Sequence, residues 1–514
     1  MMDATPLLKI YAARRLRNLQ LENIRESQSR QLMSLVRRAA ETKFGRDHDF
    51  QRISSVEDFQ GAVPLRRYED MWREYWQPAF PVLINCTWPG TVPFFALSSG
   101  TSAGASKYIP CTDQMNRANS RAALDLLVHH AANRRSTHVL GGKIFMLGGS
   151  TELTRLSEGI YAGDLSGIAA SRASAWIRPF TFPPPELALI ADWEEKVAAI
   201  SASILDQNIR AIAGTPSWLL IFFEHLFALR PQLAPRLGAF FPDLELLVHG
   251  GVNFAPYRPQ FARLLENCRA ETREAYAASE GFIAVADCRP SDGLRLITDN
   301  GLFFEFIPVG ELGGAKPARH WVENLQPGTD YAIAVTTCAG LWSYIIGDTV
   351  RFLGTSPPRL IVTGRSSYAL SSFGEHLTGE DVETAVAEAA KAIDGLVSDF
   401  AVGTLFPGAN RSRGGHQYIV EFSSAPPTAG DAQRFIELVD QELSRRNDDY
   451  RVHRSGGFGM DRPRLLIVRR GSFEAWMKSR GRLGGQNKVP RIINDQRLFA
   501  SLSEFCADRL VVSV

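Results

Sequence analysis

Short apolar runs that end in Gly, Ser or Thr recur from about residue 90 onward, and they constrain the fold more than any other feature. Runs such as "GGKIFMLGGS", "LELLVHGG" and "PRLIVTGR" have the length and residue types of strands. Helical stretches such as "QMNRANSRAALDLLVHHAA" and "DWEEKVAAISASILDQN" lie between several of them. This alternation is typical of α/β layers, in which functional groups lie on loops at strand ends. We therefore expect an α/β protein.

The pattern restarts after Gly364 and Arg365, which indicates a second domain. Beyond this point the expected order is helix, strand, strand, helix, strand, from "GEDVETAVAEAAKAI" to "PRLLIVRR". A chain of 514 residues is also longer than one hydrophobic core usually organises. We predict a large N-terminal domain over residues 1–367 and a smaller C-terminal α/β domain over residues 368–514. The first domain is expected to open with an amphipathic helical region that stops at Gly45.

The net charge and the cysteine pattern limit which partners the protein can bind and in which compartment it is expected. A net charge of +2 gives no electrostatic footprint for DNA, RNA or an anionic membrane. The longest apolar stretch, "SWLLIFFEHLFAL", is too short to cross a bilayer and contains Glu224 and His225. The six cysteines are scattered without a CxxC pair, which argues against a disulfide framework and a zinc site. Because the N-terminus lacks the apolar region and cleavage site of a signal peptide, we expect a cytoplasmic protein.

The loop "SSGTSAGASK", residues 98–107, follows the strand-like run "PFFAL". It is not a P-loop, because GxxxxGK[ST] is absent, and GxGxxG is absent as well. Its hydroxyls, flexible backbone N–H groups and single ammonium group are what a polyphosphate tail requires. The segment "GTSAG" also matches GxSxG, the hydrolase nucleophile elbow, with Ser102 as nucleophile. A flexible surface loop is a third interpretation.

Five short motifs occur in the order seen in acyl-adenylate-forming enzymes: "SSGTSAGASK", "YAASEG", "YIIGDTVRF", "TGR" and "QNKVPR". The lead-in segments "AETKFGRDHDF" and "FQGAVPLRRYEDM" and the tail "NKVPR" resemble, more closely, the Gretchen Hagen family of acyl acid amido synthetases. That family is known from plant auxin and jasmonate conjugation and has bacterial members. The resemblance spans nearly the whole chain. It implies a large N-terminal α/β domain of acyl-adenylate-forming type and a smaller, mobile C-terminal α/β domain.

The resemblance also implies an ATP site assembled from these motifs. The triphosphate would lie in the loop from Ser98 to Lys107, and Tyr276 would stack on adenine. Glu280 would be a ligand of Mg²⁺, and Asp348 would bind the ribose hydroxyls. Taken alone, "YAASE" fits equally well a strand end with a buried tyrosine and a solvent-facing glutamate. The alternative for Asp348 is an ordinary turn aspartate. The implied ATP-binding residues are Ser98, Ser99, Gly100, Thr101, Ser102, Lys107, Gly251, Tyr276, Ser279, Asp348, Arg365 and Lys488.

The implied catalytic residues are Lys488, Lys107 and Glu280, of which Glu280 is also the implied metal ligand. Lys488 lies in "GRLGGQNKVPR", on the second domain, from which it would close over ATP during adenylation and then withdraw. In the family, the acyl pocket is walled by the helix after the loop and by the stretch around "AGTPSWLL". The candidates for contact with the acid are Arg117, Arg121, Thr215, Trp218 and His249. Surface charge for the arginines and a structural role for the histidine are the alternatives.

The reaction that the resemblance implies solves a leaving-group problem. Hydroxide leaves a carboxylic acid too poorly for an amine to displace it at neutral pH. Attack of the carboxylate on the α-phosphate of ATP gives acyl-AMP and pyrophosphate, and an amine, expected to be an amino acid, then expels AMP. The implied cofactors are ATP and Mg²⁺, and we expect a monomer or weak homodimer with neither nucleic acid nor membrane as partner. The alternatives are acyl transfer to coenzyme A, a serine hydrolase using Ser102, and a non-catalytic ATP-binding protein.

Overall fold

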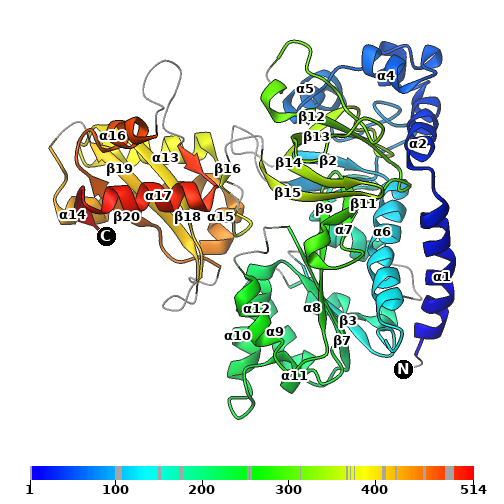
Figure 1. The fold of residues 1–514 in the computed structure, drawn as a ribbon, viewed down its shortest axis with the longest axis horizontal. Helices are drawn as coiled ribbons and strands as arrows, with labels where there is room; N and C mark the ends of the chain where they lie inside the picture. Colours follow the sequence, from blue (N-terminus) through cyan, green and yellow to red (C-terminus); the bar gives the residue numbers. More distant parts are fainter. Residues whose placement is uncertain are drawn as a thin grey trace. The chain divides into compact units, whose positions relative to one another are not determined.

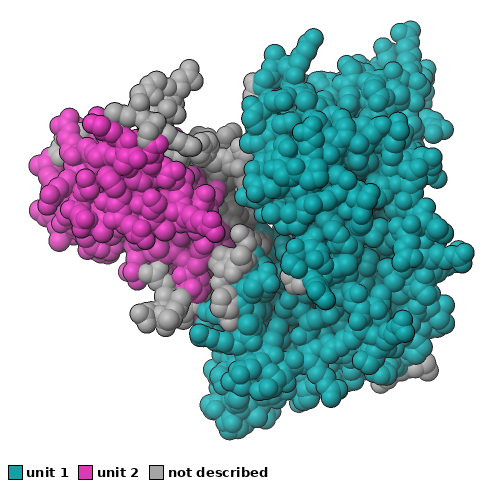
Figure 2. Space-filling view, viewed as in Figure 1, with its two compact units in different colours: residues 1–98, 107–366 teal, residues 99–106, 367–514 magenta. Residues whose placement is uncertain are grey.

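The computed structural model describes residues 3–98, 107–148, 152–172, 177–190, 193–251, 254, 257–312, 314–365, 369–370, 372–375, 377–407, 413–422, 425–454, 459–480 and 491–514 (Figure 1). The chain forms two compact units, one comprising residues 1–98 and 107–366 and the other containing residues 367–514 (Figure 2). Each unit combines sheets with helices, which confirms the predicted α/β class. No helix within the described ranges is both long and apolar enough to span a bilayer. All six cysteines are free.

The N-terminal segment is helical, as its apolar spacing predicts. Its helices are α1 (Thr5–Leu21), α2 (Ile24–Ala39), α3 (Lys43–Asp47), α4 (Val56–Ala62) and α5 (Tyr68–Met71). The amphipathic region ends earlier than predicted, because α2 stops at Ala39 and the Thr42 hydroxyl then caps α3 by accepting the N–H of Gly45 at 3.0 Å. Gly45 lies inside α3, where a Cβ would overlap the carbonyl oxygen of Ala39. Position 45 therefore requires glycine because the Ala39 carbonyl oxygen lies close to it, and not because a helix ends there.

An eleven-stranded sheet forms the centre of the first unit, in the order β12-β13-β14-β15-β11-β10-β9-β8-β7-β3-β6. Its strands are β3 (Lys143–Leu147), β6 (Thr181–Phe182), β7 (Ile209–Gly214), β8 (Leu246–Gly250), β9 (Glu271–Ala278), β10 (Gly281–Val285), β11 (Leu294–Leu296), β12 (Leu302–Pro308), β13 (Asp330–Thr337), β14 (Tyr344–Thr355) and β15 (Pro358–Arg365). The pairings from β6 to β9 are parallel, and those from β9 to β12 are antiparallel. The carboxyl ends of β7, β8 and β9 therefore meet at one edge of the sheet.

Helices cover the parallel half of this sheet. The remaining helices of the unit are α6 (Asp113–Asn133), α7 (Leu165–Ser171), α8 (Pro185–Ala188), α9 (Trp193–Ile204), α10 (Pro216–Ala228), α11 (Leu237–Phe240) and α12 (Arg258–Leu264). Leu8 of α1 and Val128 of α6 pack against Ala211 and Leu246 of the strands. On α10, Phe222 contacts Phe145 of β3, with ring centroids 4.8 Å apart. This packing holds β3, β7 and β8 in place.

A second sheet of the first unit has four strands in the order β2-β1-β5-β4. Its strands are β1 (Phe94–Ser98), β2 (Lys107–Cys111), β4 (Thr154–Ser157) and β5 (Ile160–Gly163). Strands β1 and β2 pair antiparallel, with Ser98 opposite Lys107. The two described ends of the predicted phosphate loop are therefore neighbours.

The second unit is built on a five-stranded sheet in the order β21-β18-β19-β20-β22. The strands are β18 (Val397–Leu405), β19 (Gly415–Phe422), β20 (Arg464–Val468), β21 (Ile492–Ile493) and β22 (Leu510–Ser513), and a separate pair consists of β16 (Ala369–Leu370) and β17 (Leu377–Thr378). The helices are α13 (Gly379–Ala392), α14 (Ala429–Arg446), α15 (Asp448–Arg454), α16 (Ser472–Ser479) and α17 (Gln496–Ala507). The order α13, β18, β19, α14, β20 confirms the predicted helix, strand, strand, helix, strand pattern.

Candidate functional site

Tyr276 and Asp348, which belong to two different motifs, contact each other directly. The Tyr276 hydroxyl donates a 2.7 Å hydrogen bond to Oδ2 of Asp348, 72 residues further along the chain. Tyr276 lies near the end of β9 and is 8% exposed. Asp348 lies on β14 directly opposite Arg365 of β15, the arginine of the "TGR" motif, whose side chain is outside the described part of the structure. The backbone thus brings three motifs to one region.

Glu280 lies in the tight turn between β9 and β10, where Ala278 pairs with Gly281. Its side chain is 8% exposed, so the interpretation of this residue as a solvent-facing glutamate is wrong. The pKa of Tyr344 is raised well above its ordinary value by complete burial and then by the charge of Glu280, with which it also forms a hydrogen bond. Tyr344 therefore stays protonated beside the carboxylate.

A magnesium ion fits Glu280 only with help from other ligands. The described residues contain no group of three His, Cys, Asp or Glu side chains that could hold a metal ion. Mg²⁺ is typically bound through one or two carboxylates together with substrate phosphates and water. One buried carboxylate therefore matches a metal that arrives with ATP.

Lys107, at the start of β2, lies over an aromatic ring. Its Nζ is 5.4 Å from the ring centroid of Tyr68. The Tyr68 hydroxyl accepts a 3.0 Å hydrogen bond from the backbone N–H of Tyr108, the residue after Lys107. The predicted loop residues Ser99, Gly100, Thr101 and Ser102 lie outside the described residues, as does Lys488.

Gly250 is the last residue of β8 and Gly251 follows it, and each position requires glycine for a different structural reason. A Cβ at Gly250 would overlap the carbonyl oxygen of Ala275 on β9, so this glycine allows close strand pairing. Gly251 has φ +83°, a left-handed conformation that favours glycine, and a Cβ there would lie 3.6 Å from Oγ1 of Thr215. Thr215 directly follows β7. The ends of β7 and β8 are therefore adjacent, as the parallel pairing requires.

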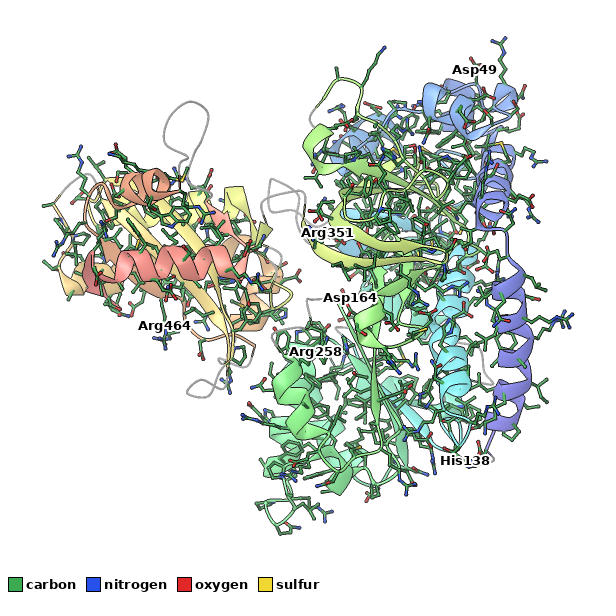
Figure 3. The ribbon with its side chains drawn as sticks, in the orientation of Figure 1. Asp49, His138, Asp164, Arg258, Arg351 and Arg464 are labelled. Carbon is green, nitrogen blue, oxygen red and sulfur yellow. The ribbon has the colours of Figure 1, made fainter. Side chains whose placement is uncertain are left out.

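His249 is buried among apolar and cationic neighbours. Its ring stacks on Phe254 with centroids 3.5 Å apart, and it is 4% exposed. Burial, followed by the charge of Arg258, lowers the pKa of His249 to about 3. Arg258, labelled in Figure 3 on α12, lies 5.6 Å from the Phe254 ring centroid. No described group makes a hydrogen bond with Nδ1 of His249. A neutral imidazole cannot supply a positive charge for a substrate carboxylate.

The other acyl-site candidates occupy two separate helices. Arg117 and Arg121 are exposed on α6. Burial by itself would raise the pKa of Asp299, but the hydrogen bond and charge of Arg15, with a smaller contribution from the charge of Arg121, lower it. Thr215 is the N-cap residue of α10, and Trp218 lies half-buried in its first turn. Arg117 and Arg121 thus lie on one helix, and Thr215 and Trp218 lie at the start of another.

Two residues near the motifs were absent from the sequence-based prediction. Tyr68 contacts Lys107, and Tyr344 contacts Glu280. Both lie in quoted segments, "FQGAVPLRRYEDM" and "YIIGDTVRF", but nothing in their local pattern distinguishes them from ordinary core tyrosines. Their roles depend on partners far away in the sequence.

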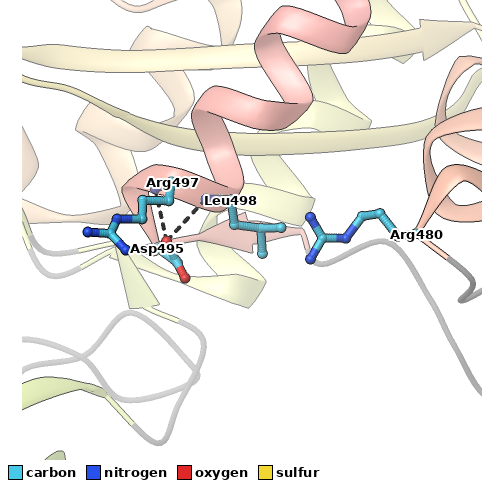
Figure 4. Close-up of a pocket in the computed structure, with 4 residues that line it drawn as sticks. All are labelled: Arg480, Asp495, Arg497 and Leu498. Carbon is cyan, nitrogen blue, oxygen red and sulfur yellow. Dashed lines mark hydrogen bonds between the residues drawn. The ribbon is translucent and has the colours of Figure 1, made fainter.

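A pocket of about 370 Å³ lies on the second unit (Figure 4). It is lined by Arg480, Asp495, Arg497 and Leu498. Asp495 caps α17 by accepting the backbone N–H groups of Arg497 at 2.9 Å and Leu498 at 3.1 Å. Asp495 therefore has a structural role in this pocket.

Comparisons with known proteins cover most of the chain. Models of the N-terminal, central and C-terminal domains of the GH3 family match residues 15–226, 295–365 and 380–497, respectively. "Indole-3-acetic acid-amido synthetase GH3.3" of Arabidopsis thaliana is 26% identical over 46% of this chain and 40% of its own length. "Probable indole-3-acetic acid-amido synthetase GH3.9" of Oryza sativa subsp. japonica is 29% identical over 43% of this chain and 53% of its own length. The matches thus span about half, or less, of these curated relatives.

Solved structures share the fold along nearly the entire chain. "AtGH3.15 acyl acid amido synthetase in complex with 2,4-DB" is 18% identical, with a TM-score of 0.61, and the match covers 98% of this chain and 97% of that one. "2-Hydroxyisobutyryl-CoA Ligase" in complex with 2-HIB-AMP and CoA is 17% identical, with a TM-score of 0.57 and coverage of 94% and 93%. At these identities, the likeness shows the fold alone.

Proposed function

Because the chain belongs to the GH3 family, with matches to all three of its domain models, we propose that it is an ATP-dependent ligase that joins a carboxylic acid to an amine through acyl-AMP. The observation that carries this proposal is the 2.7 Å contact between Tyr276 and Asp348, beside the backbone pairing of Asp348 with Arg365. These are the residues to which the resemblance assigns adenine and ribose. Curated relatives named as amido synthetases support an amide as product.

The nucleotide would lie against β9 and β14. The Tyr276 ring would stack on adenine, and its hydroxyl orients the Asp348 carboxylate toward the ribose hydroxyls. Ser279 and Gly251, at neighbouring strand ends, would contact the nucleotide from the turn side. Glu280, already buried, would hold Mg²⁺, which screens the phosphate charge when bound. Arg365 would lie near the same ribose.

Bond formation needs positioning and charge stabilisation rather than a covalent enzyme intermediate. A carboxylate oxygen of the acid attacks the α-phosphorus of ATP, and the bond to pyrophosphate breaks. The Lys107 ammonium group, with the loop from Ser98 to Ser102, would stabilise the charge that develops on the leaving pyrophosphate. The amine then attacks the acyl carbon and AMP leaves. Lys488 would act in the first step alone.

The substrates belong to the same proposal. We propose a small-molecule acid held near Thr215, Trp218 and His249, with an amino acid as the amine. The exposed Arg117 and Arg121 would meet the carboxylate of the acid. We also propose a mobile C-terminal domain from residue 368, Mg²⁺ as cofactor, a cytoplasmic location, and a monomer or weak homodimer without nucleic acid or membrane partners.

The test is acid-dependent exchange of pyrophosphate into ATP with a panel of aryl, indole and fatty acids. The proposal predicts exchange with at least one acid class and its loss by about ten- to a hundredfold in Asp348→Asn, since a charge-assisted hydrogen bond is typically worth about 1.5–3 kcal/mol. Asp330→Asn is the matched control, because Asp330 pairs with Arg351 on the same sheet, at a half-exposed position. Exchange without acid dependence, or equal loss in both variants, would contradict the proposed site.

A further inference from the structure

We propose that Tyr68 is a positioning residue that holds the Lys107 ammonium group in place for the phosphates of ATP. This inference rests on the proposed function and extends it to the segment "FQGAVPLRRYEDM", to which the reaction assigns no role. Lys107 Nζ lies 5.4 Å from the Tyr68 ring centroid, within the range of a cation–π contact. A lysine has high rotamer entropy, so a ring beneath its ammonium group reduces the cost of ordering it when ATP binds.

Tyr68 itself is rigidly held. It is 4% exposed, and its ring stacks on Trp72 with centroids 5.7 Å apart and an interplanar angle of 19°. Trp72 stacks in turn on Tyr108, at 6.1 Å. The Tyr68 hydroxyl accepts the Tyr108 N–H at 3.0 Å. The same side chain therefore contacts both the head group of Lys107 and the backbone that follows it.

The segment that carries Tyr68 is also fixed to the strand that carries Asp348. Arg66 donates its backbone N–H to the carbonyl oxygen of Ser343 at 3.1 Å and accepts the N–H of Ile345 at 2.9 Å. Tyr344, between them, begins β14, on which Asp348 lies four residues later. Tyr68 thus connects the phosphate side of the site, at Lys107, with its ribose side. Burial raises the pKa of Tyr68 to about 12, so its hydroxyl stays protonated in this connection.

Two substitutions separate the ring from the hydroxyl. Tyr68→Phe keeps the ring beneath the ammonium group and loses the hydrogen bond, whereas Tyr68→Leu loses both. Tyr331→Phe is the matched control for the hydroxyl, because Tyr331 is fully buried and its hydroxyl accepts the N–H of Gln326 at 3.1 Å. All variants are made in the full chain. ATP binding is measured by calorimetry, and the KM for ATP is measured by acid-dependent pyrophosphate exchange.

Tyr68→Leu should weaken ATP binding and raise the KM for ATP by about three- to thirtyfold, with a smaller change in kcat. Tyr68→Phe should keep most of the ATP affinity that Tyr68→Leu loses. The thermal stability of Tyr68→Phe should fall by about as much as that of Tyr331→Phe. In a Lys107→Ala background, Tyr68→Leu should have no further effect on ATP binding, because the two residues act as one unit.

Equal effects of Leu and Phe at position 68, or an undiminished effect of Tyr68→Leu without Lys107, would overturn the positioning role. These outcomes differ from failure of the proposed function, in which the unsubstituted chain binds ATP but no acid supports exchange. The binding comparison still decides the role of Tyr68 in that case. An unsubstituted chain that does not bind ATP contradicts both.

Discussion

At the scale of single residues, His249 shows how burial decides what a side chain can do. Sequence reasoning offered it as a contact for the acid, and the structure places it at the end of β8, stacked on Phe254. Its pKa is lowered from 6.5 to about 3, by burial first and by Arg258 second. The side chain is therefore neutral in the folded chain across the physiological range. It can donate or accept a hydrogen bond to an acyl group but cannot act as a cation.

This lowered pKa predicts a pH dependence of stability. Between about pH 6.5 and about pH 3, His249 binds a proton in the unfolded chain but not in the folded chain. Its contribution to the free energy of unfolding is therefore fully present above pH 6.5 and is lost as the pH falls through this window. Denaturant midpoints of the unsubstituted chain and of His249→Gln, compared from about pH 8 to about pH 4, should converge at the acid end. A constant difference would show that His249 does not titrate with a lowered pKa.

The sequence predicts which residues could carry the chemistry of the site, but it does not predict which side chains contact them. The order of the motifs assigned roles to Tyr276, Glu280, Asp348 and Lys107 by resemblance, and these roles stay predictions. Their partners followed from no local pattern: the hydrogen bond between Tyr276 and Asp348 joins residues 72 positions apart, and Tyr68 reaches Lys107 from another segment. Burial of Glu280 was likewise not predictable, because it depends on how β10 packs.

At the scale of elements, the close pairing of β8 and β9 controls the region around Tyr276. Gly250 lies opposite Ala275, the residue before Tyr276, and a Cβ at position 250 would overlap the Ala275 carbonyl oxygen. Backbone atoms cannot move aside as a flexible side chain can. A side chain at position 250 must therefore displace one of the two strands.

We predict that Gly250→Ala lowers the free energy of unfolding by about 1–3 kcal/mol, the usual cost of overpacking, and also raises the KM for ATP by moving Tyr276. Thermal unfolding and pyrophosphate exchange measure the two effects. Gly310→Ala is the control, since a Cβ at Gly310 meets no heavy atom within 4 Å. If Gly250→Ala behaved like Gly310→Ala in both measurements, β8 and β9 would not approach as closely as the structure shows.

Individual strands were more predictable than the sheet they form. The runs "KIFML", "LLVHG" and "PRLIVTGR" became β3, β8 and β15, because short apolar runs with β-branched residues bounded by glycine favour strands. The eleven-strand order, with its change from parallel to antiparallel pairing at β9, was not predictable. Which strands become neighbours depends on packing between segments far apart in the chain. The predicted helix end at Gly45 was wrong for the same reason, because this glycine allows a close contact with Ala39 inside α3.

At the scale of the whole molecule, the chain consists of two units, and the proposed catalytic residues are distributed over both. Tyr276, Glu280, Asp348 and Lys107 belong to the first unit, and the sequence places Lys488 after α16 of the second. A lysine on a separate domain can act in adenylation and be withdrawn before the amine attacks. This division of labour stays a prediction, because Lys488 lies outside the described residues.

Lys488→Ala should slow formation of acyl-AMP from acid and ATP by about a hundredfold, the typical cost of removing one group that stabilises transition-state charge. Aminolysis of acyl-AMP supplied ready-made should change far less. Rapid-quench measurement of each half-reaction provides the comparison, with Lys478→Ala, an exposed lysine on α16, as control. Equal slowing of both half-reactions would remove the special role of Lys488 in adenylation.

The measurement that tests the central claim most directly is product analysis of one complete reaction. The chain is incubated with ATP, Mg²⁺, an acid that supports exchange, and either a mixture of amino acids or coenzyme A, and products are identified by mass spectrometry. The account predicts an acyl amide, with one AMP and one pyrophosphate formed for each amide bond. Formation of ADP and phosphate, preferential formation of the thioester, or ester hydrolysis without ATP would contradict it.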